Sequence, residues 1–211
     1  MLKLYGFSRV NKFARGNTRD LRVLWALEEM QLPFEIAGMD HPNHDLDTDT
    51  FKVLNPFRQL PVIDDDGVVL SESGAILVYL ARKTGKLMPR DLAGEAQVLR
   101  WAFAAMNTVE MPLLSYWFVG LSEKEGKARD GLGEFANRHL ASLDTWLADR
   151  TYIATDELTV ADILMAHVLI SGAEEKMLAP YKHVCAYRDR CAARPAWKRT
   201  LDRYCERVEA A

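Results

Sequence analysis

Residues 55–73 read NPFRQLPVIDDDGVVLSES, and this stretch decides how the first part of the chain folds. Two short apolar runs, 61–64 and 68–71, lie on either side of Asp65-Asp66-Gly67. A glycine in such a turn accepts a positive φ angle, which a tight hairpin requires. The pattern therefore predicts two antiparallel strands joined by a short turn.

The segments around this hairpin predict a helix after it and a strand-helix-strand unit before it. After the hairpin, Ser71 is the expected N-cap of a helix over Gly74–Lys83. Before it, apolar and polar residues alternate in Leu2–Phe7, which indicates a strand, and helical spacing in Asp20–Met30 indicates a helix. Phe34–Ala37 follows as a second strand, parallel to the first because a helix connects them. The predicted order is β-α-β, a loop, and β-β-α.

The remainder of the chain is nearly all helical pattern. Gly85 suits the end of the preceding helix and Pro89 prevents the helix from continuing, so a boundary is expected there. The expected parts are a domain over 1–83, a linker over 84–91 and an all-helical domain over 92–211. The expected helices of this second domain span 92–120, 131–149, 160–172, 180–192 and 196–208. Thr159 and Asp162 have the spacing of an N-capping box at the start of the third of these helices.

The composition is that of an ordinary globular protein and argues against several classes of function. The 211 residues carry 27 Lys and Arg against 30 Asp and Glu, a net charge of −3, so neither nucleic acid nor an anionic membrane is an expected partner. No apolar segment reads as a membrane span or a signal segment. The three cysteines form no CxxC pair, which favours a reducing, cytoplasmic location. The five histidines show no metal-ligand spacing, so no metal is expected.

Four separated segments together resemble one protein family. They are Asp20–Met30 (DLRVLWALEEM), Asn55–Ile63 (NPFRQLPVI), Ser71–Leu80 (SESGAILVYL) and Thr159–Asp162 (TVAD). In this order and spacing they are similar to the cytosolic glutathione transferases, and the resemblance covers essentially the whole chain. It implies an α/β thioredoxin-like N-terminal domain followed by an all-α helical domain. It also implies glutathione as co-substrate, a cytoplasmic homodimer and a role in detoxification.

Glutathione is a short extended peptide, which a fold can bind through backbone hydrogen bonds like an added strand. The resemblance implies that the Leu60–Pro61 bond is cis, which would turn the Leu60 backbone toward the ligand. It also implies that Glu72-Ser73 holds the γ-glutamyl end, since a helix start offers free N–H groups and a favourable dipole to a carboxylate. Arg58, Gln59 and Lys52 either contact the glycyl end or lie in solvent. The implied glutathione-binding residues are Gln59, Leu60, Pro61, Glu72 and Ser73.

The chemistry requires a thiolate near neutral pH, whereas a free cysteine thiol titrates at about 8.5. A hydroxyl or amide donor near a helix N-terminus can stabilise the anion. The donor is expected in residues 8–19, a loop that is longer than is usual in the family. Counting back from the helix favours Asn17 and Thr18 as catalytic residues, which can also cap the helix. Counting forward from the strand favours Ser8, and Asn11 falls between.

The sequence predicts an enzyme that directs the glutathione thiolate at an electrophilic carbon of a largely apolar small molecule. Met106, Glu110 and Tyr116, on a long helix rich in aromatic residues and methionine, are the expected lining of the pocket for this second substrate. Two alternatives stay open. The unusual loop favours a glutathione-binding interaction module with little transferase activity. A glutathione-dependent reductase of peroxides or disulfides would use the thiol of glutathione itself.

Overall fold

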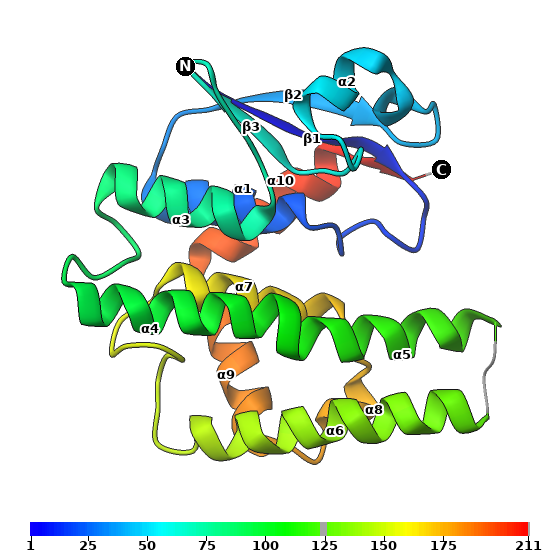
Figure 1. Ribbon diagram of the computed structural model, residues 1–211, viewed down its shortest axis with the longest axis vertical. Helices are drawn as coiled ribbons and strands as arrows, with labels where there is room; N and C mark the ends of the chain where they lie inside the picture. Colours follow the sequence, from blue (N-terminus) through cyan, green and yellow to red (C-terminus); the bar gives the residue numbers. More distant parts are fainter. Residues whose placement is uncertain (123–125, 211) are drawn as a thin grey trace. The chain divides into compact units, whose positions relative to one another are not determined.

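The computed structural model of the chain describes residues 1–122 and 126–210 (Figure 1). The chain forms two compact units, Met1–Thr84 together with Pro195–Ala211, and Gly85–Arg194. The change from one unit to the other at Thr84 lies at the expected linker. The C-terminal residues, in contrast, belong to the first unit and not to the helical part expected over 92–211, because the last helix of the chain packs against its first helix.

The first unit is built on a mixed sheet with the strand order β2-β1-β3-β4. Its strands are β1 (Leu2–Val10), β2 (Glu35–Asp40), β3 (Val62–Asp65), β4 (Val68–Ser71) and β5 (Glu209–Ala210). β1 runs parallel to β2 and antiparallel to β3, and β3 forms the expected hairpin with β4. β5 pairs with the end of β1, so the C-terminal residues join the sheet.

Helices cover both faces of this sheet (Figure 1). α1 (Asp20–Met30), α3 (Ser73–Thr84) and α10 (Pro195–Arg207) lie on one face, where α1 packs against both of the others. α2 (Asp49–Leu54) and the 3₁₀ turn before it (Asp45–Asp47) cover the other face. Successive side chains of a strand point to opposite faces, so the sheet presents an apolar surface to each helical layer.

The second unit is all-helical, as expected, and α7 is its buried centre. Every residue from Val160 to Leu169 is buried, and all of them except Asp162 and His167 are apolar, as is typical of a helix surrounded by other helices. A π-helical turn interrupts the long helix expected over 92–120. No helix among the described residues is long and apolar enough to cross a membrane. The elements are α4 (Leu92–Phe103), the π-helical turn (Ala104–Val109), α5 (Glu110–Ser122), α6 (Lys127–Leu147), α7 (Val160–Ser171), α8 (Glu175–Leu178) and α9 (Lys182–Ala192).

Local sequence signals predicted the start of α7 correctly but placed the end of the first strand too early. The N-capping box of Thr159 and Asp162 is present. β1 continues to Val10, beyond its expected end at Phe7, because its last two residues pair with β5. That partner comes from the C-terminus, so no local pattern announces the extension.

The expected N-cap of the helix after the hairpin was wrong. Ser71 lies in β4, where it pairs with Val62, and α3 begins at Ser73. Glu72 stands directly before the helix with φ at 69°, and its carbonyl accepts the first helical hydrogen bond, from Ile76 N–H at 2.9 Å. β4 ends at Ser71, as the expected strand 68–71 does, so Ser71 still belongs to the hairpin and Glu72 takes the position directly before the helix.

Candidate functional site

The residues expected to bind glutathione lie together where β3 and α3 begin. Val62 pairs with Ser71 in the hairpin, so the two residues before Val62 lie beside the two residues after Ser71. This register brings Leu60-Pro61 next to Glu72-Ser73. The Leu60–Pro61 peptide bond is cis, as expected.

The loop before Pro61 is fixed by a buried asparagine. Asn55 is 2% exposed, and its Nδ2 donates to the Gln59 carbonyl at 2.8 Å. Its Oδ1 accepts from the Phe57 N–H at 3.0 Å. These two bonds set the path of the backbone into β3 and leave the Gln59 side chain exposed.

The side chains around this junction combine an exposed acid with a buried hydroxyl. Glu72 is exposed, whereas Ser73 is only 5% exposed and begins α3. A carboxylate accepts hydrogen bonds from an ammonium group, and a hydroxyl at a helix start donates to a carboxylate. The pair therefore offers complementary partners to a group that carries both charges, such as the α-amino and α-carboxylate groups of an amino acid.

Arg22 of α1 donates a hydrogen bond to Ser73 and was not identified from the sequence. It is 1% exposed within α1, and its Nη1 donates to Ser73 Oγ at 3.3 Å. An arginine inside an apolar helical run is rarely buried without a specific partner. Its position within LRVLWAL, residues 21–27, was the signal that could have indicated this role.

Arg58 and Lys52 are each occupied by a neighbouring acid. Arg58 Nη1 lies 3.2 Å from Asp47 Oδ1, and Lys52 Nζ lies 2.6 Å from Asp49 Oδ1. Such surface pairs are weak, so both cations stay able to exchange partners. A contact with the glycyl end of glutathione stays a prediction for both residues.

The two residues expected to act on the thiol, Asn17 and Thr18, differ in environment. Asn17 is exposed, whereas the Thr18 hydroxyl lies 2.6 Å from the Tyr204 hydroxyl of α10. The expectation that they cap α1 was wrong. Arg19 occupies the N-cap position in helical conformation, and the helix has no side-chain cap.

Asp20 connects the start of α1 to the end of β1 and was also missed. Its side chain is fully buried, and Oδ2 accepts from the Phe7 N–H at 3.0 Å. A Cβ atom at Gly6 would approach Oδ2 to 2.9 Å, so the close packing depends on that glycine. Burial raises the pKa of the Asp20 carboxyl, and hydrogen bonds from Thr18 and the Phe7 amide partly offset this.

We expect Asp20→Asn to become more stable relative to the native chain as the pH rises above about 4. A carboxyl whose pKa is raised by folding binds its proton more tightly in the folded state, so its deprotonation at higher pH destabilises the fold. Asparagine keeps an oxygen acceptor for Phe7 and does not ionise. Urea unfolding at pH 4.5 and 7.5 measures the difference, with the exposed Asp202→Asn on α10 as control. A stability difference that is independent of pH would contradict this assignment.

The other two candidates among residues 8–19 are Ser8 and Asn11, which lie in β1 and directly after it. Ser8 is inside β1, and its Cβ lies 2.9 Å from the position that a Cβ on Gly38 would take. Asn11 is exposed in the turn after the strand. Arg15 donates to the carbonyl of Val208 at 2.8 Å, which attaches the loop to the C-terminal residues. Loop residues and C-terminal residues thus support each other, a long-range relation that counting along the loop does not detect.

In the second unit, the three expected pocket residues lie on two consecutive elements, the π-helical turn and α5. Met106 lies in the π-helical turn, and Glu110, which is 8% exposed, begins α5. The Tyr116 ring stacks against the Arg129 guanidinium of α6, 4.4 Å from its centroid. A substrate pocket formed by Met106, Glu110 and Tyr116 stays a prediction.

Within the described residues, no group of three His, Cys, Asp or Glu could hold a metal ion.

Comparisons with known proteins identify the family of both parts. The family model for the glutathione S-transferase N-terminal domain matches residues 21–83, and that for the C-terminal domain matches residues 106–195. An uncharacterized GST-like protein of Streptococcus mutans is 30% identical, with 90% of this chain and 80% of that protein covered. The disulfide-bond oxidoreductase YghU of Escherichia coli is 29% identical, over 89% of this chain and 72% of that protein.

A solved structure agrees with these matches. It is a glutathione transferase family member from Pseudomonas fluorescens with two glutathione bound, and it is 26% identical to this chain. The TM-score is 0.83, and the alignment covers 95% of this chain and 92% of that one. With a thioredoxin-like α/β unit, a helical unit and these relatives, the chain belongs to the glutathione S-transferase family.

Proposed function

We propose that this chain is a glutathione transferase that conjugates the glutathione thiolate to electrophilic, largely apolar small molecules. The observation that carries the proposal is the junction of Leu60-Pro61 with Glu72-Ser73, in which Arg22 donates a hydrogen bond to Ser73. A cytoplasmic homodimer that acts in detoxification is part of the same proposal.

Each part of the junction suits one part of glutathione. The Leu60 backbone pairs with the extended peptide as an added strand does. The Glu72 carboxylate accepts from the γ-glutamyl ammonium, and the N-terminus of α3 attracts the adjacent carboxylate. Because Ser73 Oγ accepts from Arg22, the hydroxyl proton of Ser73 is left to donate to that carboxylate. Gln59 and Pro61 complete the edge along which the peptide lies.

Stabilisation of the thiolate is proposed for the start of α1. Asn17 is exposed, so its side-chain amide is available as a donor to the sulfur. The Thr18 hydroxyl bonds both the Tyr204 hydroxyl and the Asp20 carboxyl, so it positions this loop and adds a second donor only if it releases Asp20. The positive pole of α1 lies at the same place and favours the anion.

We expect Glu72→Gln and Ser73→Ala each to weaken glutathione binding about tenfold, since each removes one charge-assisted hydrogen bond. Isothermal titration calorimetry with glutathione measures the loss. Glu35→Gln, which removes an exposed acid at the start of β2, serves as the matched control and is expected to bind as the native chain does. Unchanged affinity in both site variants would overturn the proposed binding mode.

A second activity, glutathione-dependent disulfide reduction, is supported by the similarity to a disulfide-bond oxidoreductase and to a structure with two glutathione bound. In that reaction two glutathione molecules reduce one disulfide, and they leave as one glutathione disulfide while the substrate leaves as two thiols. Rates with 1-chloro-2,4-dinitrobenzene and with 2-hydroxyethyl disulfide separate the two activities. Conjugation is expected to dominate. Glutathione binding without turnover of either substrate would favour an interaction module.

A further inference from the structure

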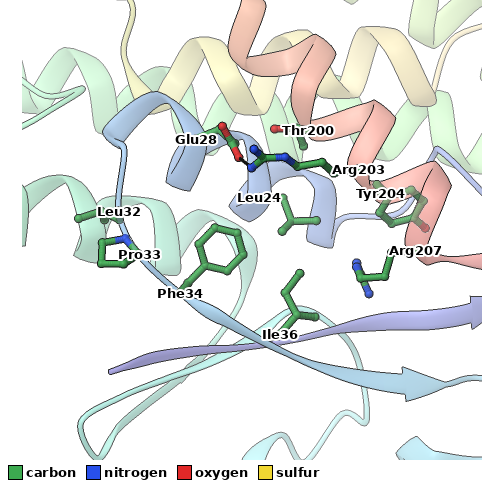
Figure 2. A pocket seen from close by; sticks show the side chains of 10 residues that line it. All are labelled: Leu24, Glu28, Leu32, Pro33, Phe34, Ile36, Thr200, Arg203, Tyr204 and Arg207. Atoms are coloured by element: carbon green, nitrogen blue, oxygen red, sulfur yellow. Dashed lines mark hydrogen bonds and ion pairs between the residues drawn. The ribbon is translucent and has the colours of Figure 1, made fainter.

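Tyr204 of α10 is buried beside the loop that carries Asn17 and Thr18. It is 1% exposed and lies about one turn before Arg207, in the wall of the pocket between α1, β2 and α10 that Figure 2 shows. A buried tyrosine usually has a hydrogen-bond partner for its hydroxyl. The partners of this hydroxyl lie in the loop between β1 and α1, and Thr18 among them is 186 residues earlier in the chain.

The Tyr204 hydroxyl bonds both neighbours of Asn17 in the sequence. Its oxygen lies 2.6 Å from Thr18 Oγ1, and it also accepts a hydrogen bond from the Gly16 backbone. Gly16 has a φ angle of 85°, a left-handed conformation that glycine adopts without strain. Tyr204 therefore fixes the chain on either side of Asn17, which is the exposed residue of the three.

The hydrogen bonds around Thr18 have one direction. Burial raises the pKa of the Tyr204 hydroxyl, and the charge of Asp20 raises it further. The charge of Arg207 on the same helix opposes this rise without cancelling it. Tyr204 therefore keeps its proton near neutral pH and donates it to Thr18 Oγ1. Because a carboxylate accepts and does not donate, Thr18 gives its own proton to the buried Asp20.

This direction decides which side chain of the loop can serve the sulfur. The Thr18 hydroxyl has its proton on Asp20 and accepts from Tyr204, so it is occupied on both sides. The Asn17 side-chain amide is exposed and can donate to a thiolate. A donor stabilises a developing anion most when its position is fixed before the charge forms. The bonds of Tyr204 to the two residues beside Asn17 supply that fixed position.

We propose that Tyr204 is a positioning residue for the thiolate of glutathione. Its hydroxyl is buried and does not touch the sulfur. It holds Gly16 and Thr18, so that the Asn17 amide keeps its place beside the N-terminus of α1. The role rests on the proposed function, since it requires a glutathione thiolate at the start of α1. It gives the C-terminal helix a part in the chemistry that the sequence of the loop does not contain.

Tyr204→Phe tests this role because it removes the hydroxyl and keeps the ring. A glutathione thiolate absorbs in the ultraviolet, so a pH titration of the complex measures the pKa of the bound thiol. We expect Tyr204→Phe to raise this pKa by about one unit, which leaves about tenfold less thiolate near neutral pH. The kcat with 1-chloro-2,4-dinitrobenzene should fall by the same factor. The KM for glutathione should stay near its native value, since the γ-glutamyl end is bound by Glu72-Ser73.

The pH dependence of kcat separates positioning from a loss of fold. At a pH above the pKa of the bound thiol in both proteins, glutathione is ionised in either, so the kcat of Tyr204→Phe should return toward the native value. A variant that had merely lost stability would lose activity at every pH. Tyr79→Phe is the matched control, because it removes a hydroxyl that donates to the buried Asp65 at 2.8 Å in the same unit. It is expected to keep the native pKa of the bound thiol.

Variants of Thr18 keep the test decisive if Tyr204→Phe folds poorly. Thr18→Val removes the partner of Tyr204 from the loop and is expected to raise the pKa of the bound thiol as Tyr204→Phe does. The double variant should raise it no further than the larger single change, because both remove the same bond. Thr18→Ser keeps a hydroxyl and should raise it much less than Thr18→Val.

The outcomes distinguish a failure of this role from a failure of the proposed function. A native pKa of the bound thiol in Tyr204→Phe, or a loss of kcat that is equal at every pH, would overturn the role of Tyr204 alone. A native chain that binds glutathione without lowering the pKa of its thiol below that of free glutathione would overturn the proposed transferase chemistry, and the role of Tyr204 with it.

Discussion

Replacing Asp162 by alanine is expected to lower the free energy of unfolding by about 3–5 kcal/mol, because the carboxylate satisfies several buried donors at once. It accepts from the N–H groups of Ile153 at 2.8 Å and Thr159 at 2.9 Å. It also accepts from the Thr159 hydroxyl at 2.9 Å and the Tyr187 hydroxyl at 3.0 Å. Alanine would leave these donors buried without a partner at the start of the central helix of its unit.

Urea unfolding followed by circular dichroism measures this loss. Asp162→Asn keeps one oxygen acceptor and should fall between alanine and the native chain. The control is Asp149→Ala, which removes an exposed acid of the same unit that pairs only with the adjacent Arg150 among the described residues; little change is expected. A loss below about 1 kcal/mol for Asp162→Ala would show that the buried bonds are not worth the values assumed here.

The Asp162 network also shows which part of a structure can be read from local sequence. The spacing of Thr159 and Asp162 predicted the capping box, because both partners lie in one helical turn. Tyr187 and Ile153 could not be predicted as partners, since the first comes from another helix and the second from a loop. Periodicity and caps describe short segments, whereas the choice among distant donors depends on packing.

The candidate site divides in the same way. Leu60-Pro61 and Glu72-Ser73 lie side by side because the hairpin, which the sequence predicted, fixes their register locally. The environment of Thr18 could not be predicted, since its hydrogen-bond partner Tyr204 comes from the last helix of the chain. Arg22 carried a signal, an isolated charge in an apolar run, but its partner Ser73 lies in a different helix.

Within the first unit, a pair of tryptophans joins the C-terminal helix α10 to α1. Trp25 of α1 is fully buried and Trp197 of α10 is 4% exposed. Their ring centroids lie 4.8 Å apart with the planes tilted by 44°. Aromatic pairs at this distance add a favourable contact to the area that each ring buries.

We expect Trp25→Ala and Trp197→Ala each to lower the free energy of unfolding of the first unit by about 3–5 kcal/mol. The double variant should lose less than the sum, by about 1 kcal/mol, because each single change already removes the contact between the rings. Urea unfolding gives the three values, and Lys198→Ala, at an exposed position beside Trp197, is the control.

Hydrogen exchange then tests whether the contact between Trp25 and Trp197 also stabilises the loop before α1. Trp197→Ala is expected to lower the protection of the α10 amides and of the amides in the loop between β1 and α1 (residues 11–19), because Thr18 bonds Tyr204 and Arg15 bonds the Val208 carbonyl. Protection of α10 that is unchanged in this variant would mean that the helix is fixed by other contacts. A loss of protection in both α10 and the loop would instead show that packing of the C-terminal helix stabilises the proposed thiolate-stabilising loop. The sequence of the loop alone does not predict this dependence.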